Sequence, residues 1–202
     1  MKIESIKNVN ITGLFSVPLD HLLISPDKIV SLFNTGTNPV DIKKSVIEAP
    51  GLKVIVFPEL KKEFIFENVR VLVSDRGEVT PENTTVIDDF KKLIDNNIFD
   101  SKKLTAFGFN FDAIVIPDST FSVSDLIGTK LSKFPNIQNA GVNIVFDKDG
   151  LKYNFALAPL GVENKYLAHF NVHIQQDFPD VTEVKRQLLA QYAEFNDVIL
   201  KI

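Results

Sequence analysis

The sequence predicts an α+β protein built on a largely antiparallel sheet that helices cover on one face. Three observations support this fold class. Several segments alternate polar and apolar residues, four segments carry helix start signals, and the two halves of the chain repeat the same order of segments. The 202 residues include no cysteine, so the core must form without disulfides, which a chain of this length can do.

The strands are predicted from alternation with a period of two residues and from the turn residues between the segments. Two strands are long and three pairs read as hairpins, with one further strand near the end. The long strands are 8–17 and 104–116, the hairpins are 46–47 with 53–57, 61–66 with 69–74 and 142–146 with 151–157, and the last strand is 166–175.

The helices are predicted from their first residues. Two begin with a capping residue followed by proline, which fits the first helical position, and two have the spacing of a capping box. These signals are Ser25-Pro26, Thr80-Pro81, Ser122 with Asp125, and Asp180 with Glu183. The first helix is expected to end at 34–36, and Pro135 is expected to end the third.

The order strand, helix, several strands, helix occurs twice along the chain. The segment 10–15 lies 100 positions before the similar segment 110–115, and a proline and a capped helix follow each of them. We therefore expect an internal duplication of a strand–helix–(3–4 strands)–helix unit, with 1–99 as the first α+β repeat and 100–202 as the second. The two repeats are expected to pack as one compact unit. The alternative is a chance likeness between two α+β halves.

The order of elements alone resembles the saddle of the TATA-box-binding protein, which is itself a tandem repeat. No sequence motif carries this resemblance, so it implies a saddle-like fold and no function. Nucleic-acid binding is not expected, because the net charge is −4 and the exposed sheet face lacks the Arg and Lys residues that phosphate contacts require.

The sequence contains none of the common catalytic or cofactor-binding motifs, so no catalytic residue and no cofactor is predicted. No metal site is predicted either, because His169 and His173 on one strand would lie roughly 13 Å apart. The N-terminus has no apolar signal region and no segment approaches the ~20 apolar residues of a membrane span. A cytoplasmic location without membrane contact is the expectation.

The second half of the predicted sheet has one aromatic face and one polar face. The aromatic face contains Phe107, Phe109 and Phe111 and should pack against the long helices. The opposite face has short amide and imidazole side chains, which suit close approach by a hydrogen-bonding partner. The predicted binding residues are Asn110, Asp112, Asn143, Asn154, His169, Asn171 and His173.

In the first half, the corresponding face is expected to carry four apolar residues, which are costly to leave in water. These predicted interface residues are Leu14, Ile55, Ile65 and Leu72. Either other segments of the chain cover them, or a partner or a second copy of the chain does.

The predicted function is a non-catalytic protein-interaction or assembly module. Its outer polar and semi-apolar sheet face would bind a protein partner, a second copy of the chain as a homodimer, or a polar ligand. The alternative is a small-ligand-binding protein or enzyme with a site around His169, Asn171 and Asp112. A general acid or base would need an imidazole next to a carboxylate. We expect solvent-accessible histidines without such a pair.

Overall fold

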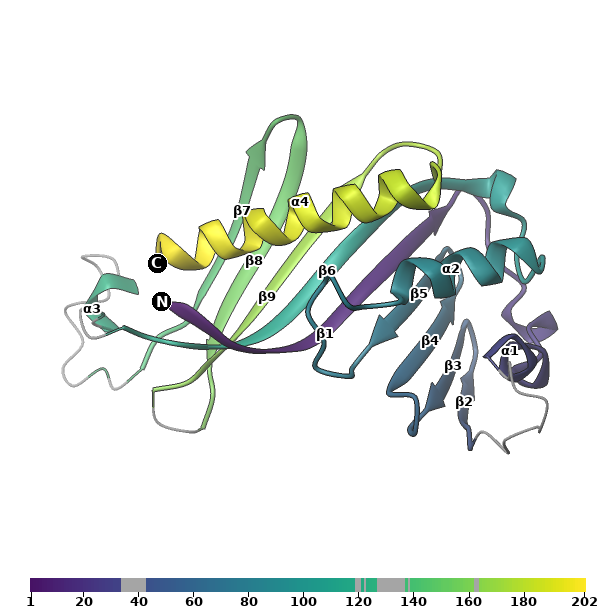
Figure 1. Ribbon diagram of the computed structural model, residues 1–202, viewed down its shortest axis with the longest axis horizontal. Helices are drawn as coiled ribbons and strands as arrows, with labels where there is room; N and C mark the ends of the chain where they lie inside the picture. The colour runs from purple at the N-terminus through teal and green to yellow at the C-terminus, as the bar shows by residue number, and fades with distance from the viewer. Residues whose placement is uncertain (34–42, 119–120, 122, 127–136, 138, 162–163) are drawn as a thin grey trace.

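The computed structural model describes residues 1–33, 43–118, 121, 123–126, 137, 139–161 and 164–202 (Figure 1). The strands are β1 (Lys2–Phe15), β2 (Ser45–Ala49), β3 (Leu52–Phe57), β4 (Lys62–Glu67), β5 (Arg70–Asp75), β6 (Leu104–Ile116), β7 (Val142–Lys148), β8 (Leu151–Pro159) and β9 (Tyr166–Ile174). The α-helices are α1 (Pro26–Phe33), α2 (Val86–Asp95), α3 (Val123–Leu126) and α4 (Val181–Leu200), and short 3₁₀ helices are η1 (His21–Leu23) and η2 (Ser101–Lys103).

All nine strands join in one antiparallel sheet with the order β2-β3-β4-β5-β1-β6-β9-β8-β7. The two long strands, β1 and β6, pair at its centre, and Asn10 lies opposite Asn110. On either side of this pair, the strands of each half follow in reverse chain order. The fold is therefore α+β with a fully antiparallel sheet, as the alternating segments predicted.

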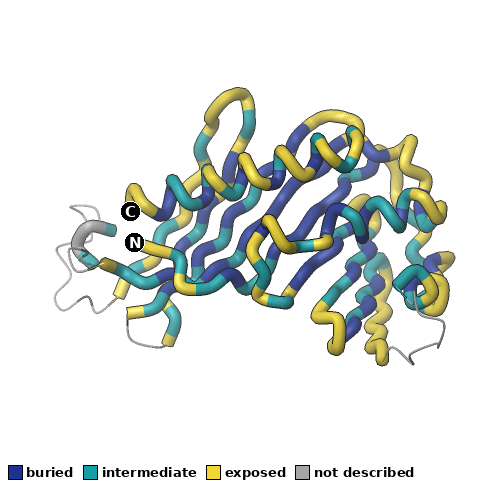
Figure 2. Tube along the Cα trace, in the orientation of Figure 1, coloured by how far each residue is buried: buried dark blue, intermediate teal, exposed yellow. Residues whose placement is uncertain are grey.

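Helices α1, α2 and α4 contact the same face of the sheet, and Figure 1 shows α2 and α4 lying along it. Phe33 of α1 packs on Phe64, with 5.0 Å between ring centroids. Gly13 of β1 allows α2 to approach closely, because a Cβ there would lie 2.7 Å from the Phe90 ring. Figure 2 shows the resulting core, with the central strands buried and the turns exposed.

The core of the second half is aromatic. Phe195 of α4 is fully buried and stacks on Phe111 with 5.8 Å between ring centroids and an interplanar angle of 11°. Its ring also contacts Phe170 of β9 and Phe155 of β8. The prediction that the strand face with Phe107, Phe109 and Phe111 is a core face is confirmed, because all three are fully buried.

The three predicted hairpins and the strand ending near 175 are confirmed, with boundaries that differ by a few residues. The first strand begins at Lys2 and not near 8, because the whole N-terminal segment pairs with β6. Helix α4 begins after Asp180, whose carboxylate accepts a hydrogen bond from the Glu183 N–H at 3.0 Å.

The predicted start of the second helix is wrong. The segment 80–85 forms a turn in which the N–H groups of Asn83 and Thr84 donate to the Thr80 carbonyl, and α2 begins only at Val86. The predicted end of the first helix at 34–36, the capping residue Ser122 and Pro135 lie outside the described residues.

Among the described residues, no helix is long and apolar enough to cross a membrane.

Candidate functional site

The outer face of the sheet is the face opposite the one that α1, α2 and α4 contact. Strand pairing places Ser74, Asn10, Asn110, Asn171 and Asn154 side by side on five neighbouring strands of this face. The Asn110 amide donates to the Asn10 Oδ1 at 2.5 Å, and the Asn171 amide donates to the Asn110 Oδ1. This amide row ties the two halves of the chain together across the centre of the sheet.

Burial changes along the amide row. Asn10 and Asn110 at the centre are buried, at 5% and 7% exposure, and the amide nitrogen and oxygen of Asn110 are both hydrogen-bonded within the row. Asn171 is half-buried and Asn154 is exposed. Among the predicted binding residues, Asn110 is therefore a structural member of the row, whereas Asn154 and Asn171 present polar groups to solvent.

His169 and Asp112 are in hydrogen-bond contact on the outer face, with 2.6 Å between Nδ1 and Oδ1. The Asn8 amide donates to the second carboxylate oxygen of Asp112 at 2.9 Å. Burial by itself raises the pKa of Asp112, but the hydrogen bonds from His169 and Asn8 outweigh it and hold the pKa below its usual value. The prediction that no histidine contacts a carboxylate is wrong, because β6 and β9 pair Asp112 directly with His169.

His173 lies against Gly108 on the neighbouring strand. A Cβ at Gly108 would lie 2.4 Å from the His173 Cδ2 atom and 2.3 Å from the Val172 carbonyl oxygen. Although the residue as a whole is exposed, this partial burial lowers the pKa of His173, and the positive charge of Arg70 lowers it further. Glycine at position 108 therefore makes room for the imidazole.

We expect Gly108→Ala to lower the free energy of unfolding by about 1–3 kcal/mol, as overpacking does elsewhere, and to displace the His173 ring. The matched control is Gly161→Ala, because no atom lies within 4 Å of a Cβ placed there. Denaturant unfolding and the His173 ring resonances in NMR spectra measure the two effects. Equal stability of both variants would contradict this packing.

The charge of Arg70 acts on His173 across the outer face. Arg70 and His173 are on β5 and β9, which are three strand spacings apart, or about 14 Å in a flat sheet. The Arg70 guanidinium is held by both oxygens of Glu67, at 2.7 and 2.8 Å, yet its charge still acts on His173. Arg70 therefore adds to the effect of burial on the pKa of His173.

A hollow of about 550 Å³ lies on the outer face beside the amide row. Three predicted binding residues, Asn154, Asn171 and His173, line it. Its other lining residues are Val145, Gly150, Leu151, Lys152 and Gln175. Asn143 lies outside this hollow, on the exposed strand β7.

The outer face of the first half is more apolar. Leu14, Ile65 and Leu72 lie there and are half-buried, together with Val54 and Val56 of β3. Ile47 of β2 extends this apolar row and is 56% exposed.

The prediction that Ile55 belongs to this face is wrong. Ile55 is fully buried and lies opposite Phe64, on the face that the helices contact. Strand pairing places the side of β3 with residues 53, 55 and 57 on the helix face, although this side carries the charge of Lys53. Lys53 is buried, and its Nζ donates to the Ile24 carbonyl at 2.8 Å and lies 3.5 Å from Glu48.

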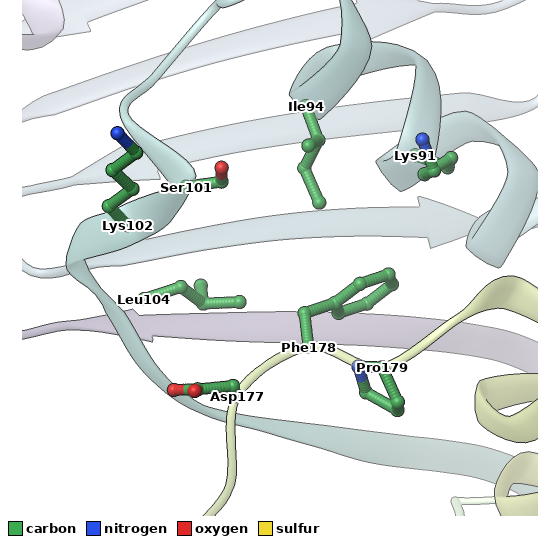
Figure 3. A pocket seen from close by; sticks show the side chains of 8 residues that line it. All are labelled: Lys91, Ile94, Ser101, Lys102, Leu104, Asp177, Phe178 and Pro179. Atoms are coloured by element: carbon green, nitrogen blue, oxygen red, sulfur yellow. The ribbon is translucent and has the colours of Figure 1, made fainter.

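A second hollow, of about 440 Å³, lies between α2, η2 and the loop before α4 (Figure 3). Ile94, Leu104 and Phe178 form its apolar wall, and Lys91, Ser101, Lys102, Asp177 and Pro179 complete its lining. Sequence reasoning missed it, because its residues come from four separate segments. Phe178 also packs on Phe90 and Phe107, so this loop contributes to the core.

The described residues include no group of three or more His, Cys, Asp or Glu side chains placed to hold a metal ion. Comparison of the sequence with protein-family models and with curated proteins gave no match.

Proposed function

We propose that the protein is a non-catalytic interaction module that binds a protein partner through the outer face of its sheet. The observation that carries this proposal is the state of the charges on that face. Glu63 pairs with Arg76, Glu67 pairs with Arg70, and Asp112 pairs with His169. Asp147 lies opposite Lys152 on the outermost hairpin, and the face between these charged residues offers amide, imidazole and aliphatic groups.

This composition favours a protein over a small molecule as the partner. The cores of protein interfaces are poor in unpaired charge and combine apolar contact with roughly one hydrogen bond per 100–200 Å². The half-buried aliphatic row around Ile65 and Leu72 offers the apolar contact. The hollow with Asn154, Asn171 and His173 offers donors and acceptors a few strands away on the same face.

Site-specific photo-crosslinking in the native host tests this proposal. A benzophenone amino acid is placed at Asn154 or at Ile47, which lie on the outer face on opposite sides of the sheet centre. The control position is Ala190, an exposed residue of α4. We expect a discrete protein adduct from the outer-face positions and none from Ala190.

The same experiment distinguishes the partners. An adduct of twice the chain mass identifies a second copy, and any other mass identifies a different protein. Adducts from Ala190 alone, or no adduct from either outer-face position, would overturn the proposal.

A second candidate is an enzyme or small-ligand-binding protein with its site at His169, Asp112 and Asn171. The observation that favours it is the 2.6 Å contact between His169 and Asp112. With Asp112 ionised, the contact requires the proton of a neutral imidazole on Nδ1, which leaves Nε2 free as a base. Among the residues that the structure describes, no hydroxyl group donates a hydrogen bond to His169. A nucleophile would therefore have to come from the substrate or from water.

We expect Asp112→Asn to change the neutral tautomer of His169, which long-range ¹⁵N–¹H spectra above pH 8 report directly. The loss of a charged hydrogen bond should also cost about 1–2 kcal/mol of stability at neutral pH. Because folding lowers the pKa of Asp112, its contribution is present above the unfolded value of about 3.9 and disappears as the pH falls through the folded value. The difference between wild type and variant should therefore shrink below about pH 4. A tautomer that is unchanged by the substitution would contradict the pairing.

We also infer that the chain arose by tandem duplication. The mirrored strand order makes β3, β4 and β5 counterparts of β7, β8 and β9, and leaves β2 without a counterpart. With an offset of 100 positions, Asn10 and Asn110 would be equivalent, and their pairing is consistent with a local two-fold axis between them. Under this relation Leu72 corresponds to His169, and Ile65 to Ala156. One copy of the outer face would then have stayed aliphatic while the other became polar.

A further inference from the structure

Strand β7 is an open edge of the sheet with an unusually apolar surface. Val145 is 63% exposed and Ile144 is 42% exposed, and within the described part of the chain β7 pairs only with β8. Natural edge strands are commonly blunted by proline, by a bulge or by charges along the strand. β7 has no proline, and its charges, Asp147 and Lys148, are confined to the end beside the turn.

The turn determines which backbone groups of β7 face the open edge. Asp149 and Gly150 form a two-residue loop with φ values of 51° and 78°, and Lys148 lies opposite Leu151. In such a hairpin the residues that close the loop exchange both backbone hydrogen bonds, and the pattern then alternates along the ladder. Phe146 and Ile144 therefore bond to β8, whereas Asp147, Val145 and Asn143 direct their N–H and C=O groups outward.

This alternation of outward-facing backbone groups allows β7 of one copy to pair with β7 of a second copy. In an antiparallel arrangement centred on Val145, the Val145 residues of two copies form a hydrogen-bonded pair, and Asn143 of each copy lies opposite Asp147 of the other. Each of these pairs joins residues whose backbone groups face outward. The side chains match as well, with valine against valine and a carboxamide against a carboxylate, so no like charges are opposed.

The other open edge, β2, does not offer an equivalent pairing. The same reasoning from its two-residue loop directs the backbone groups of Val46 and Glu48 outward, with Lys44 beyond the start of the strand. Both charged residues already have partners within the chain, since Lys44 contacts Asp27 and Glu48 lies 3.5 Å from the Lys53 Nζ. Self-pairing of β2 would compete with both contacts.

We propose that two copies of the chain associate through their β7 edges, in antiparallel register about Val145, and form one continuous sheet. Within each copy, β3 takes the strand β2 on its edge in the same antiparallel manner, and β3 is the counterpart of β7 in the mirrored strand order. Val145 lines the hollow that contains Asn154, Asn171 and His173. In the dimer, Val145 of the second copy lies opposite this Val145 and extends the wall of that hollow.

Disulfide trapping tests the register directly, because the wild-type chain contains no cysteine. In the proposed dimer the two Val145 Cα atoms are about 5.5 Å apart, which is within the range that a disulfide spans. We expect Val145→Cys to give a covalent dimer under mild oxidation at least ten times faster than the control Val46→Cys on the β2 edge. Equal rates for the two variants would overturn the proposal.

Light scattering on the full chain gives an independent readout. We expect wild type to be a dimer at micromolar concentration and Val145→Pro to be a monomer, because proline removes the outward N–H without affecting the bonds to β8. Val145→Lys, which opposes two positive charges, should also be a monomer, and Val46→Pro should stay dimeric. Circular dichroism establishes that each variant is folded.

A monomeric wild type would overturn the proposal. So would a dimer that Leu72→Asp dissolves and the Val145 variants do not, since that result would place the interface on the outer face. An edge dimer can itself give an Asn154 adduct of twice the chain mass, because Asn154 lies opposite Val145. Ile47 lies on β2, at the opposite end of the sheet from β7, so photo-crosslinking at Ile47 tests the outer face independently of this experiment.

Discussion

Replacing Asp75 with alanine is expected to lower the free energy of unfolding by about 2–3 kcal/mol, because it removes one of the two carboxylates that contact the Lys62 ammonium and the acceptor of two further hydrogen bonds. Asp75 ends β5 with its side chain 7% exposed, and it accepts hydrogen bonds from Lys62 at 2.6 Å, Thr84 at 2.9 Å and the Gly77 N–H at 3.0 Å. Asp89 of α2 lies 3.2 Å from the same Lys62 Nζ. The cluster therefore fastens α2 to the sheet through one ammonium group.

Thermal and denaturant unfolding measure this effect, with Asp95→Ala as the control. Asp95 pairs only with Lys91 on the exposed side of the same helix, so its loss should change stability little. Burial alone raises the pKa of Asp75, but the hydrogen bonds from Lys62 and Gly77 outweigh it and lower the pKa. The stabilising effect should thus be complete above about pH 4 and be lost as the pH falls through the folded value. Equal losses for Asp75→Ala and Asp95→Ala would contradict this account.

Replacing Phe195 with alanine is expected to cost about 3–5 kcal/mol, the usual range for removing a buried phenylalanine. The ring is fully buried between α4 and the second half of the sheet, and it contacts Phe111, Phe155 and Phe170. These four rings come from three strands and one helix, so their neighbours are fixed in place and can close only part of the cavity.

The control for Phe195→Ala is Leu200→Ala at the end of the same helix, where the side chain is 70% exposed. Denaturant unfolding followed by circular dichroism compares the two variants. A loss of less than 1 kcal/mol for Phe195→Ala, or similar losses for both, would show that α4 is held by other contacts.

The sequence was most informative where burial alternates cleanly along a strand. Phe107, Phe109 and Phe111 are large and buried, and the residues between them are small or polar, so both faces of β6 could be assigned. Helix α4 could be assigned because Asp180 and Glu183 form a local capping motif that does not depend on the rest of the fold.

The contacts of the candidate site and the burial of Lys53 depend on how distant strands pair, and the alternation of residues along one strand does not predict that pairing. The contact between Asp112 and His169 follows from the register of β6 against β9, whose residues are more than fifty positions apart. Lys53 lies on the buried side of β3, where the Ile24 carbonyl and Glu48 satisfy its ammonium, and alternation along the strand does not reveal these contacts. A charged residue signals exposure only when nothing in the fold neutralises it.

Methyl NMR spectroscopy of the purified chain, titrated with the protein recovered from the Asn154 photo-crosslink, tests the central claim most directly. Ile65 and Leu72 report on the outer face, and Leu189 and Leu200 report on the exposed side of α4. The account predicts shifted or broadened methyl signals at Ile65 and Leu72, with Leu189 and Leu200 unchanged. Perturbation confined to Leu189 and Leu200 would place the partner on the helices and contradict the account.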